Sequence, residues 1–303
     1  MLESENTNSP PSHASDVECV FKSHALVGEG PVWNNKRKVL HWVDVIGPHI
    51  HTFSPKESTL ASYKLPHIVS AVLPTANGRL IAVTEKGIAL LNENSGELDF
   101  ISNPESALPN NRFNDAKTDT KGRIWAGSMN RKANEDTGSL YRFDTPFSAS
   151  RMDTGFKVSN GLGWCPKNKT MYFTETVSAT IFAYEFDKET GEISNRREFL
   201  KFDIQNGKPD GICVDCDGNI WVAFWDGWRV SGYTSKGELI RDIMVPVPRV
   251  TSCCFGGRDM KRLYITTASA GLNEEQMQQA PLSGSLFAIN LDTEGQKTHE
   301  VRM

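Results

Sequence analysis

A hairpin-forming pattern that recurs six times limits the folds open to this chain. Its clearest copy is residues 208–224, KPDGICVDCDGNIWVAF, in which an Asp-Gly turn joins two apolar strand segments. Such turns need positive φ and mark β-hairpins. Related segments occur at GEGPVWNNKRKVLHWVD, VSAVLPTANGRLIAVT, FNDAKTDTKGRIWAGS, SNGLGWCPKNKTMYFTE and TSCCFGGRDMKRLYITT. Six related hairpins predict a repeat architecture.

The spacing of the hairpins identifies that architecture. The first apolar residues after the six turns are 41 to 49 residues apart, at Val39, Leu80, Ile124, Met171, Ile220 and Leu263. A repeat of about 40 to 50 residues that carries about four strands is typical of a β-propeller blade. We therefore predict an all-β, six-bladed β-propeller, in preference to a two-sheet sandwich. The strand expected over Val17 to Leu26 should pair with the last strands and close the ring.

Composition narrows the class of protein. A net charge of −4 over 303 residues gives no electrostatic case for nucleic acid or an anionic membrane. The chain contains no apolar run of the roughly 18 residues that span a bilayer. We expect residues 1–16 to be a disordered leader, because they are polar and rich in Ser, Pro and Asn, and residues 17–303 to be a single propeller domain. Six cysteines in so long a chain do not suggest a disulfide framework, which favours a cytoplasmic protein. We expect a monomer or weak dimer.

The repeat register also locates a candidate site. In a propeller the first strand of each blade lines the central channel. Counting back ten residues from each marker, with one extra residue allowed in the fourth turn, gives the equivalent position in each blade. These positions are Glu29, Ser70, Asn114, Asn160, Asp210 and Cys253, and Thr251 and Ser252 lie beside the last of them. Buried carboxylates and amides without partners are costly, so their convergence suggests a cation. The alternative is that these residues make ordinary hydrogen bonds at turns and strand starts.

Five ordered motifs carry a family resemblance: GEGPVW, RFND, SNGLGW, PDG and TSCCFGG. From about Val17 onward the chain resembles the gluconolactonase and regucalcin family, which includes the senescence marker protein and the luciferin-regenerating enzyme of insects. The resemblance implies one divalent metal ion at the channel mouth (Ca²⁺, Zn²⁺, Mn²⁺ or Fe²⁺) and hydrolysis of sugar lactones. The residues implied are Glu29, Asn160 and Asp210 as metal ligands, and Arg112, Asn114 and Asp115 as substrate contacts.

The residue types suit that chemistry. A metal ion can polarise a lactone carbonyl and acidify bound water, and Asp210 is the best candidate base. Arg112 offers a planar fork of donors for ring or hydroxyl oxygens. We therefore expect an enzyme that opens small sugar lactones such as glucono-lactone. The alternatives are a calcium-binding regulatory protein, an ester or organophosphate hydrolase, a luciferin-regenerating activity, and an interaction propeller without chemistry.

Two other features have less weight. Cys213 and Cys216 form a CxxC pair, but strand alternation sends the two side chains to opposite faces, so we predict core and turn roles rather than redox or zinc chemistry. The polar segment from Met129 to Gly138 resembles the family's variable loop over the site and is expected to be a mobile lid.

Overall fold

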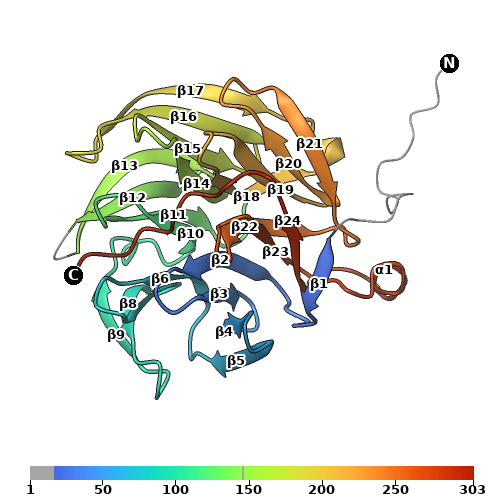
Figure 1. Ribbon diagram of the computed structural model, residues 1–303. Helices are drawn as coiled ribbons and strands as arrows, with labels where there is room; N and C mark the ends of the chain where they lie inside the picture. Colours follow the sequence, from blue (N-terminus) through green and yellow to red (C-terminus); the bar gives the residue numbers. More distant parts are fainter. Residues whose placement is uncertain (1–16, 145–146) are drawn as a thin grey trace.

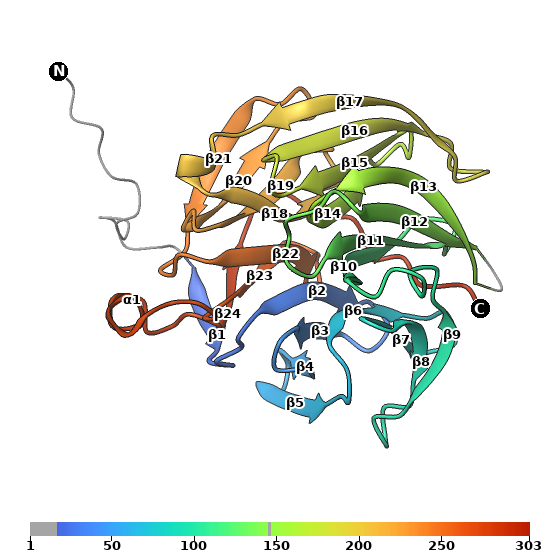
Figure 2. The ribbon, with the colours of Figure 1, turned by 180° about the vertical axis from the view of Figure 1, so that it is seen from behind.

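Six four-stranded antiparallel sheets surround a central channel in the computed structural model, which describes residues 17–144 and 147–303 (Figures 1 and 2). The predicted all-β, six-bladed β-propeller is confirmed. The predicted leader, residues 1–16, lies outside the described residues. Within each blade the strands follow one another from the channel to the rim, because every hairpin pairs consecutive strands.

The strands fall into four concentric sets. The innermost are β2 (Gly28–Asn34), β6 (Val69–Pro74), β10 (Asn111–Thr118), β14 (Ser159–Trp164), β18 (Lys208–Val214) and β22 (Val250–Gly256). The second are β3 (Val39–Asp44), β7 (Leu80–Thr84), β11 (Ile124–Asn130), β15 (Thr170–Glu175), β19 (Ile220–Trp225) and β23 (Arg262–Thr267). The third are β4 (His49–Ser54), β8 (Gly87–Leu91), β12 (Gly138–Asp144), β16 (Thr180–Phe186), β20 (Arg229–Tyr233) and β24 (Leu286–Asn290). The outermost are β5 (Thr59–Lys64), β9 (Leu98–Ser102), β13 (Ser148–Phe156), β17 (Ile193–Lys201), β21 (Leu239–Met244) and β1 (Glu18–Phe21).

The two ends of the chain close the ring. Blades 1 to 5 are β2–β5, β6–β9, β10–β13, β14–β17 and β18–β21, and blade 6 is β22–β24 completed by β1. β1 pairs antiparallel with β24, as expected, although it covers only Glu18–Phe21 of the longer segment predicted. Each innermost strand contacts the innermost strands of both neighbouring blades. Besides the strands, the described residues form a 3₁₀ turn at Ile204–Asn206 and the helix α1 at Glu274–Gln279.

Tryptophans from the second strands and the innermost strands pack between blades. Trp33 stacks on Tyr264 between blades 1 and 6, with ring centroids 6.0 Å apart. Trp125 meets Trp164 edge to face between blades 3 and 4 at 6.1 Å. The Trp125 indole also donates to the Asp119 carboxylate in its own hairpin turn, at 2.9 Å. Aromatic burial of this kind holds the wedge-shaped blades together.

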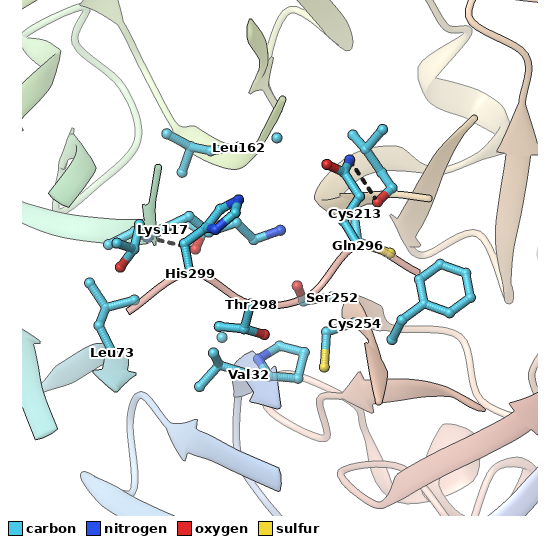
Figure 3. Close-up of a pocket in the computed structure, with 18 of the residues that line it drawn as sticks. Val32, Leu73, Lys117, Leu162, Cys213, Ser252, Cys254, Gln296, Thr298 and His299 are labelled. Atoms are coloured by element: carbon cyan, nitrogen blue, oxygen red, sulfur yellow. Dashed lines mark hydrogen bonds between the residues drawn. The ribbon is translucent and has the colours of Figure 1, made fainter. Parts of the chain in front are cut away.

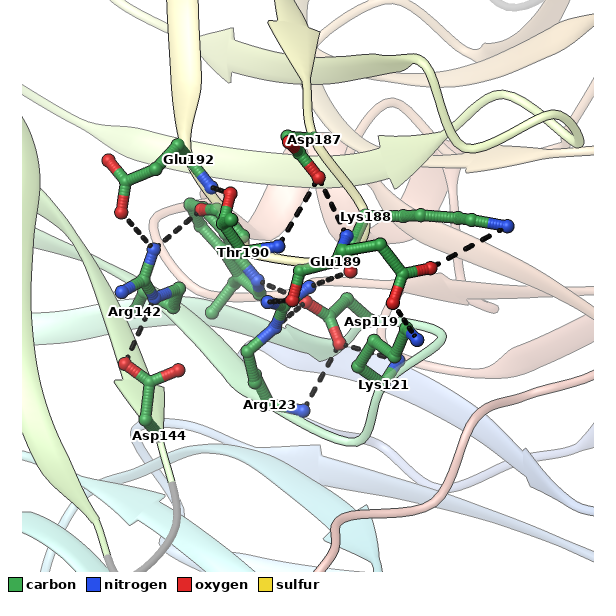
Figure 4. Close-up of polar contacts among 12 residues, drawn as sticks. Asp119, Lys121, Arg123, Arg142, Asp144, Asp187, Lys188, Glu189, Thr190 and Glu192 are labelled. Carbon is green, nitrogen blue, oxygen red and sulfur yellow. Dashed lines mark hydrogen bonds and ion pairs between the residues drawn. The ribbon is translucent and has the colours of Figure 1, made fainter.

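Guanidinium groups add a polar contact between blades 3 and 4 (Figure 4). The turn that joins β16 to β17 docks on blade 3, where Arg123 donates to the Lys188 carbonyl at 2.8 Å. Arg142 donates to the Gly191 carbonyl at 2.7 Å and to Glu192 at 2.8 Å. These bonds satisfy turn carbonyls, so the cluster has a structural role.

A C-terminal strap, residues 291–303, crosses one end of the channel and touches all six blades (Figure 1). Its partners in blades 1 to 6 are Asn35, Pro74 with Ala76, Gly122, Trp164, Cys216 and Met260. The strap spans the end at which the innermost strands finish. The residues at the starts of these strands therefore form the opposite, open mouth. Among the described residues, none of the helices has the length and apolar character needed to cross a membrane.

Candidate metal and substrate site

An irregularity in pairing occurs at the same place in all six innermost strands. The shifts fall at Glu29/Val32, Val69/Ala71, Phe113/Asp115, Ser159/Leu162, Pro209/Ile212 and Val250/Ser252. Such bulges re-aim a side chain that regular alternation would send elsewhere. The polar residues at them are Glu29, Ser70, Asn114, Asn160, Asp210 and Thr251.

The sixth predicted position needs a correction. Counting placed Cys253 there, but the bulge in β22 lies at Thr251, and Cys253 pairs regularly with Ile265. The count failed because, measured from the marker Leu263, blade 6 has a longer turn between β22 and β23. Cys253 is instead a buried core residue whose sulfur lies 3.6 Å from that of Cys213. Cys216 of the CxxC pair is exposed, which agrees with core and turn roles for the two cysteines.

Four of the six bulge residues link neighbouring blades. Each of three donates to the carbonyl that precedes the next bulge residue around the ring: Ser70 to Phe113 (2.7 Å), Asn114 to Ser159 (2.9 Å) and Thr251 to Gly28 (2.5 Å). Asn160 achieves the same link through Thr176, whose hydroxyl donates to the Pro209 carbonyl at 2.9 Å. These four residues therefore make structural hydrogen bonds between blades, and Asn160 does so through its amide nitrogen alone.

The two carboxylates break the pattern. An ionised Glu29 or Asp210 cannot donate a hydrogen bond to the next carbonyl. Glu29 Oε2 accepts from the Gly30 amide at 2.9 Å, and Asp210 Oδ1 is buried without a partner among the described residues. Asn160 Oδ1 and Asp115 Oδ2 are likewise buried without partners. Three oxygens without partners, in side chains at most 4% exposed, are costly unless a ligand satisfies them.

Burial and mutual repulsion keep these acids from ionising readily. Burial, reinforced by the charge of Asp115, raises the pKa of Glu29 to about 8. Burial also raises the pKa of Asp115 to about 6, against the opposing charge of Lys117. The pKa of Asp210 is raised well above its ordinary value by burial and then by the charges of Glu29 and Asp115. A positive charge placed among these three acids would stabilise their ionised forms.

The donor set fits a divalent cation of the oxygen-seeking class. The residues that could hold it are Glu29, Asn160 and Asp210, which supply carboxylate and amide oxygens. The Asn160 amide nitrogen is committed to Thr176, so its free oxygen is the atom left for a ligand. In the described part of the chain no three or more His, Cys, Asp or Glu side chains cluster in a way that could hold a metal ion. A cation held by Glu29 and Asp210 could also take the amide oxygen of Asn160.

The predicted substrate contacts lie beside these residues. Arg112 Nη1 donates to the Phe113 carbonyl and to Asn114 Oδ1, both at 2.8 Å. Both ends of the Asn114 amide are thereby used, since its nitrogen donates to Ser159. Asn114 thus orients Arg112, while Asp115, whose Oδ2 has no partner among the described residues, lines the channel cavity. Burial, followed by the charge of Arg131, lowers the pKa of Arg112 to about 10.

A channel cavity of about 120 Å³ lies between the acids and the strap (Figure 3). Asp115 and Lys117 line it from β10, and Gln296, Thr298 and His299 line it from the strap. The Lys117 ammonium donates to the Ile212 carbonyl. Sequence reasoning missed Lys117, although its spacing of two from Asp115 in RFNDAK places both on one strand face.

The expected lid segment is tied at both ends. Met129 belongs to β11 and forms a bridge with Val158 of the next blade. Thr137 and Asn111 exchange two hydrogen bonds, at 2.7 and 3.0 Å. Only residues 131–137 lie outside the strands, so a lid function of this loop stays a prediction.

Residues 27–269, four fifths of the chain, match the protein family described as the SMP-30/gluconolactonase/LRE-like region. The chain belongs to this family. The resemblance carried by the five sequence motifs is therefore confirmed, and the match extends from the first innermost strand to the end of blade 6's second strand.

Individual members of the family support the same assignment. A Bacillus subtilis (strain 168) protein, named for an inferred activity as sugar lactone lactonase YvrE, is 36% identical over 274 residues, which is 90% of this chain and 94% of that protein. A luciferin-regenerating enzyme has a TM-score of 0.89 and 29% identity, covering 96% of this chain and all of that one. Regucalcin from Agrobacterium tumefaciens strain C58, described as a calcium-binding protein, has a TM-score of 0.91 and 25% identity, covering 96% and 98%.

Proposed function

We propose that this protein is a divalent-metal-dependent hydrolase that opens small sugar lactones, of which glucono-lactone is the first example, to the corresponding acids. Family membership and the lactonase-named relative support hydrolysis of lactones. The observation that carries the proposal is the set of unpartnered buried oxygens on Asp115, Asn160 and Asp210 beside the Arg112 guanidinium. A propeller that only presented its surface to a partner would have no use for such a costly mouth.

Each of these residues would have a separate role in the reaction. A divalent ion held by Glu29, Asn160 and Asp210 would supply Lewis acidity toward the lactone carbonyl. Asp210 can accept a proton from an attacking water at Oδ1, which has no partner among the described residues. The part of the Arg112 fork not bonded to Phe113 and Asn114 can orient ring and hydroxyl oxygens. Asp115 Oδ2 can accept a hydrogen bond from a substrate hydroxyl.

A calcium-binding regulatory role is the second candidate, because the Agrobacterium relative is described as calcium-binding and the donor atoms here are all oxygens. Calcium binding alone would not require a guanidinium beside the carboxylates, which favours the enzyme. The oxygen donors suit Ca²⁺ or Mn²⁺ better than Zn²⁺ or Fe²⁺. A cytoplasmic location is proposed on the ground that all six cysteines are free.

The function is tested by assaying a panel of aldonolactones with the metal-free protein and after addition of Ca²⁺, Mn²⁺, Zn²⁺ or Fe²⁺. We expect metal-stimulated ring opening of at least one lactone and its loss in chelator. Tight Ca²⁺ binding without turnover of any lactone would support the regulatory role instead.

Stability without metal should fall as pH rises, and a divalent ion should reverse this trend. Folding raises the pKa of Glu29 from 4.5 to about 8 and that of Asp115 from 3.8 to about 6, so the folded protein retains protons that the unfolded chain has lost. Between these values the unfolded state binds fewer protons, and the free energy of unfolding decreases with pH. A divalent ion favours the ionised acids. The Ca²⁺-induced rise in Tm should therefore be larger at about pH 8 than at about pH 5.

Thermal unfolding in chelator and in Ca²⁺ at the two pH values measures this effect. Glu29→Gln is the comparison variant, because it removes a carboxyl whose pKa rises to about 8 on folding and should flatten the metal-free dependence of stability on pH. An equal Ca²⁺ shift at both pH values would contradict a cation held by these acids.

A further inference from the structure

An ion pair bridges blades 2 and 3 at the open mouth. Glu85, in the turn between β7 and β8, pairs with Arg131, in the turn after β11, at 2.8 Å. The two side chains are 18% and 35% exposed. The other Glu85 oxygen lies 3.7 Å from His67 Nδ1. This cluster is not among the predicted site residues, yet it lies next to Arg112.

Strand register places the two guanidinium groups on one face of blade 3. Arg112 pairs directly with Met129, and the Arg131 amide continues the ladder by donating to the Asn110 carbonyl at 2.8 Å. Arg131 is thus the diagonal cross-strand neighbour of Arg112, at a typical separation of about 7–8 Å. The effect of Arg131 in lowering the pKa of Arg112 agrees with that placement.

Within the described part of the chain, the two guanidinium groups have one carboxylate partner between them at the rim. The charged groups that act on Arg112 are Arg131, Glu29 and Glu85. Glu29 is one of the proposed ligands of the divalent ion, and Glu85 pairs with Arg131 but not with Arg112. Among the described residues, the ion pair of Arg131 with Glu85 uses Nη2, and the hydrogen bonds of Arg112 use Nη1. Each planar fork therefore keeps donors for a further acceptor.

We propose that Arg131 and Arg112 form an anion-binding rim, and that the preferred lactone carries a carboxylate or phosphate group remote from its carbonyl. The inference rests on the proposed function, since it takes the Arg112 side of the mouth to be the substrate side. Paired guanidinium forks match the planar oxygens of a carboxylate and the tetrahedral oxygens of a phosphate. A neutral sugar lactone would form weaker hydrogen bonds with the remaining guanidinium donors than an anionic group would.

Binding of three sugar acids, measured by calorimetric titration of the full chain with and without Ca²⁺, tests the rim without requiring turnover. The probes are gluconate, glucarate with a second carboxylate, and 6-phosphogluconate. We expect at least one of the two acids that carry a second anionic group to bind about tenfold more tightly than gluconate. The one that gains identifies the anion as carboxylate or phosphate. Added salt should reduce the preference, because the rim is partly exposed.

Two variants should shift the preference in opposite directions. Arg131→Gln should abolish the tenfold advantage, whereas Glu85→Gln should increase it by releasing Arg131 from its partner. A merely structural ion pair would weaken the protein in both variants without this change of sign. Arg151→Gln is the matched control, because it removes an exposed arginine from β13 of the same blade and should leave the preference unchanged.

The outcomes separate this inference from the proposed function. Equal binding of all three acids, binding of none, or a preference that survives Arg131→Gln would overturn the rim. A clear anion preference combined with no hydrolysis of any lactone would uphold the rim and remove the lactonase proposal.

Discussion

Replacing Asp210 with alanine is expected to lower metal-stimulated lactone hydrolysis by about a hundredfold or more and to leave the propeller folded. The substitution removes a proposed ligand and the proposed base together. Among residues 17–144 and 147–303, Asp210 has no hydrogen bond to the next blade comparable to those of Ser70, Asn114 and Thr251. Its Oδ1 is buried without a partner. The metal-free variant should therefore have a higher Tm than the metal-free wild type, because a costly buried acid is gone.

Three measurements together make this prediction specific: the rate of ring opening, the Tm in chelator, and the Ca²⁺-induced rise in Tm. Asp210→Asn should behave in the same direction with a smaller rise in stability, since it keeps a polar group in place. Asp217→Ala removes an exposed carboxylate from the hairpin of the same blade and should change neither rate nor Ca²⁺ response. Full turnover by folded Asp210→Ala would remove Asp210 from the mechanism.

The repeat period explains why so much of the fold could be predicted from the sequence. Each hairpin carries its own turn signal, and a blade cannot bury both faces alone, so six copies at regular spacing specify a ring. The register within the ring then selected Glu29, Asn114, Asn160 and Asp210 without any structural knowledge, because equivalent positions in a repeat lie at equivalent depths in the channel. The structure places all four at the bulges.

Features that depend on the meeting of distant segments could not be predicted in this way. Thr251 replaces Cys253 at the mouth because a bulge and a longer turn shift blade 6 against the count. The strap has no periodic pattern, and its course across six blades follows from scattered bonds such as that of Gln296 to the Trp164 carbonyl. Arg131 acquires its place only through the pairing of β10 with β11. Assignment of metal and substrate roles to the site residues stays a prediction.

Gly161→Ala should be among the most damaging small substitutions in the chain. A Cβ at this position would lie 2.5 Å from the Ile212 amide nitrogen and 2.7 Å from the Asp210 carbonyl oxygen. Both are backbone atoms of β18, so neither can turn aside, and β14 would have to move away from its neighbour. The expected cost is about 3 kcal/mol or more of the free energy of unfolding.

The same displacement should separate Asn160 from Asp210. Asn160 directly precedes Gly161, and the Asp210 carbonyl is one of the backbone groups from which β14 would have to move away. The Ca²⁺-induced rise in Tm should therefore vanish at temperatures where the variant is still folded. Gly163→Ala, two residues along the same strand, is the matched control: its Cβ would meet the Val214 Cγ2 methyl at 2.8 Å, a side-chain atom that can shift, at a cost of about 1 kcal/mol. Denaturant unfolding of both variants measures the difference. If the two proved equally stable and equally responsive to Ca²⁺, close backbone contact between blades 4 and 5 could not be what sets the geometry of the site.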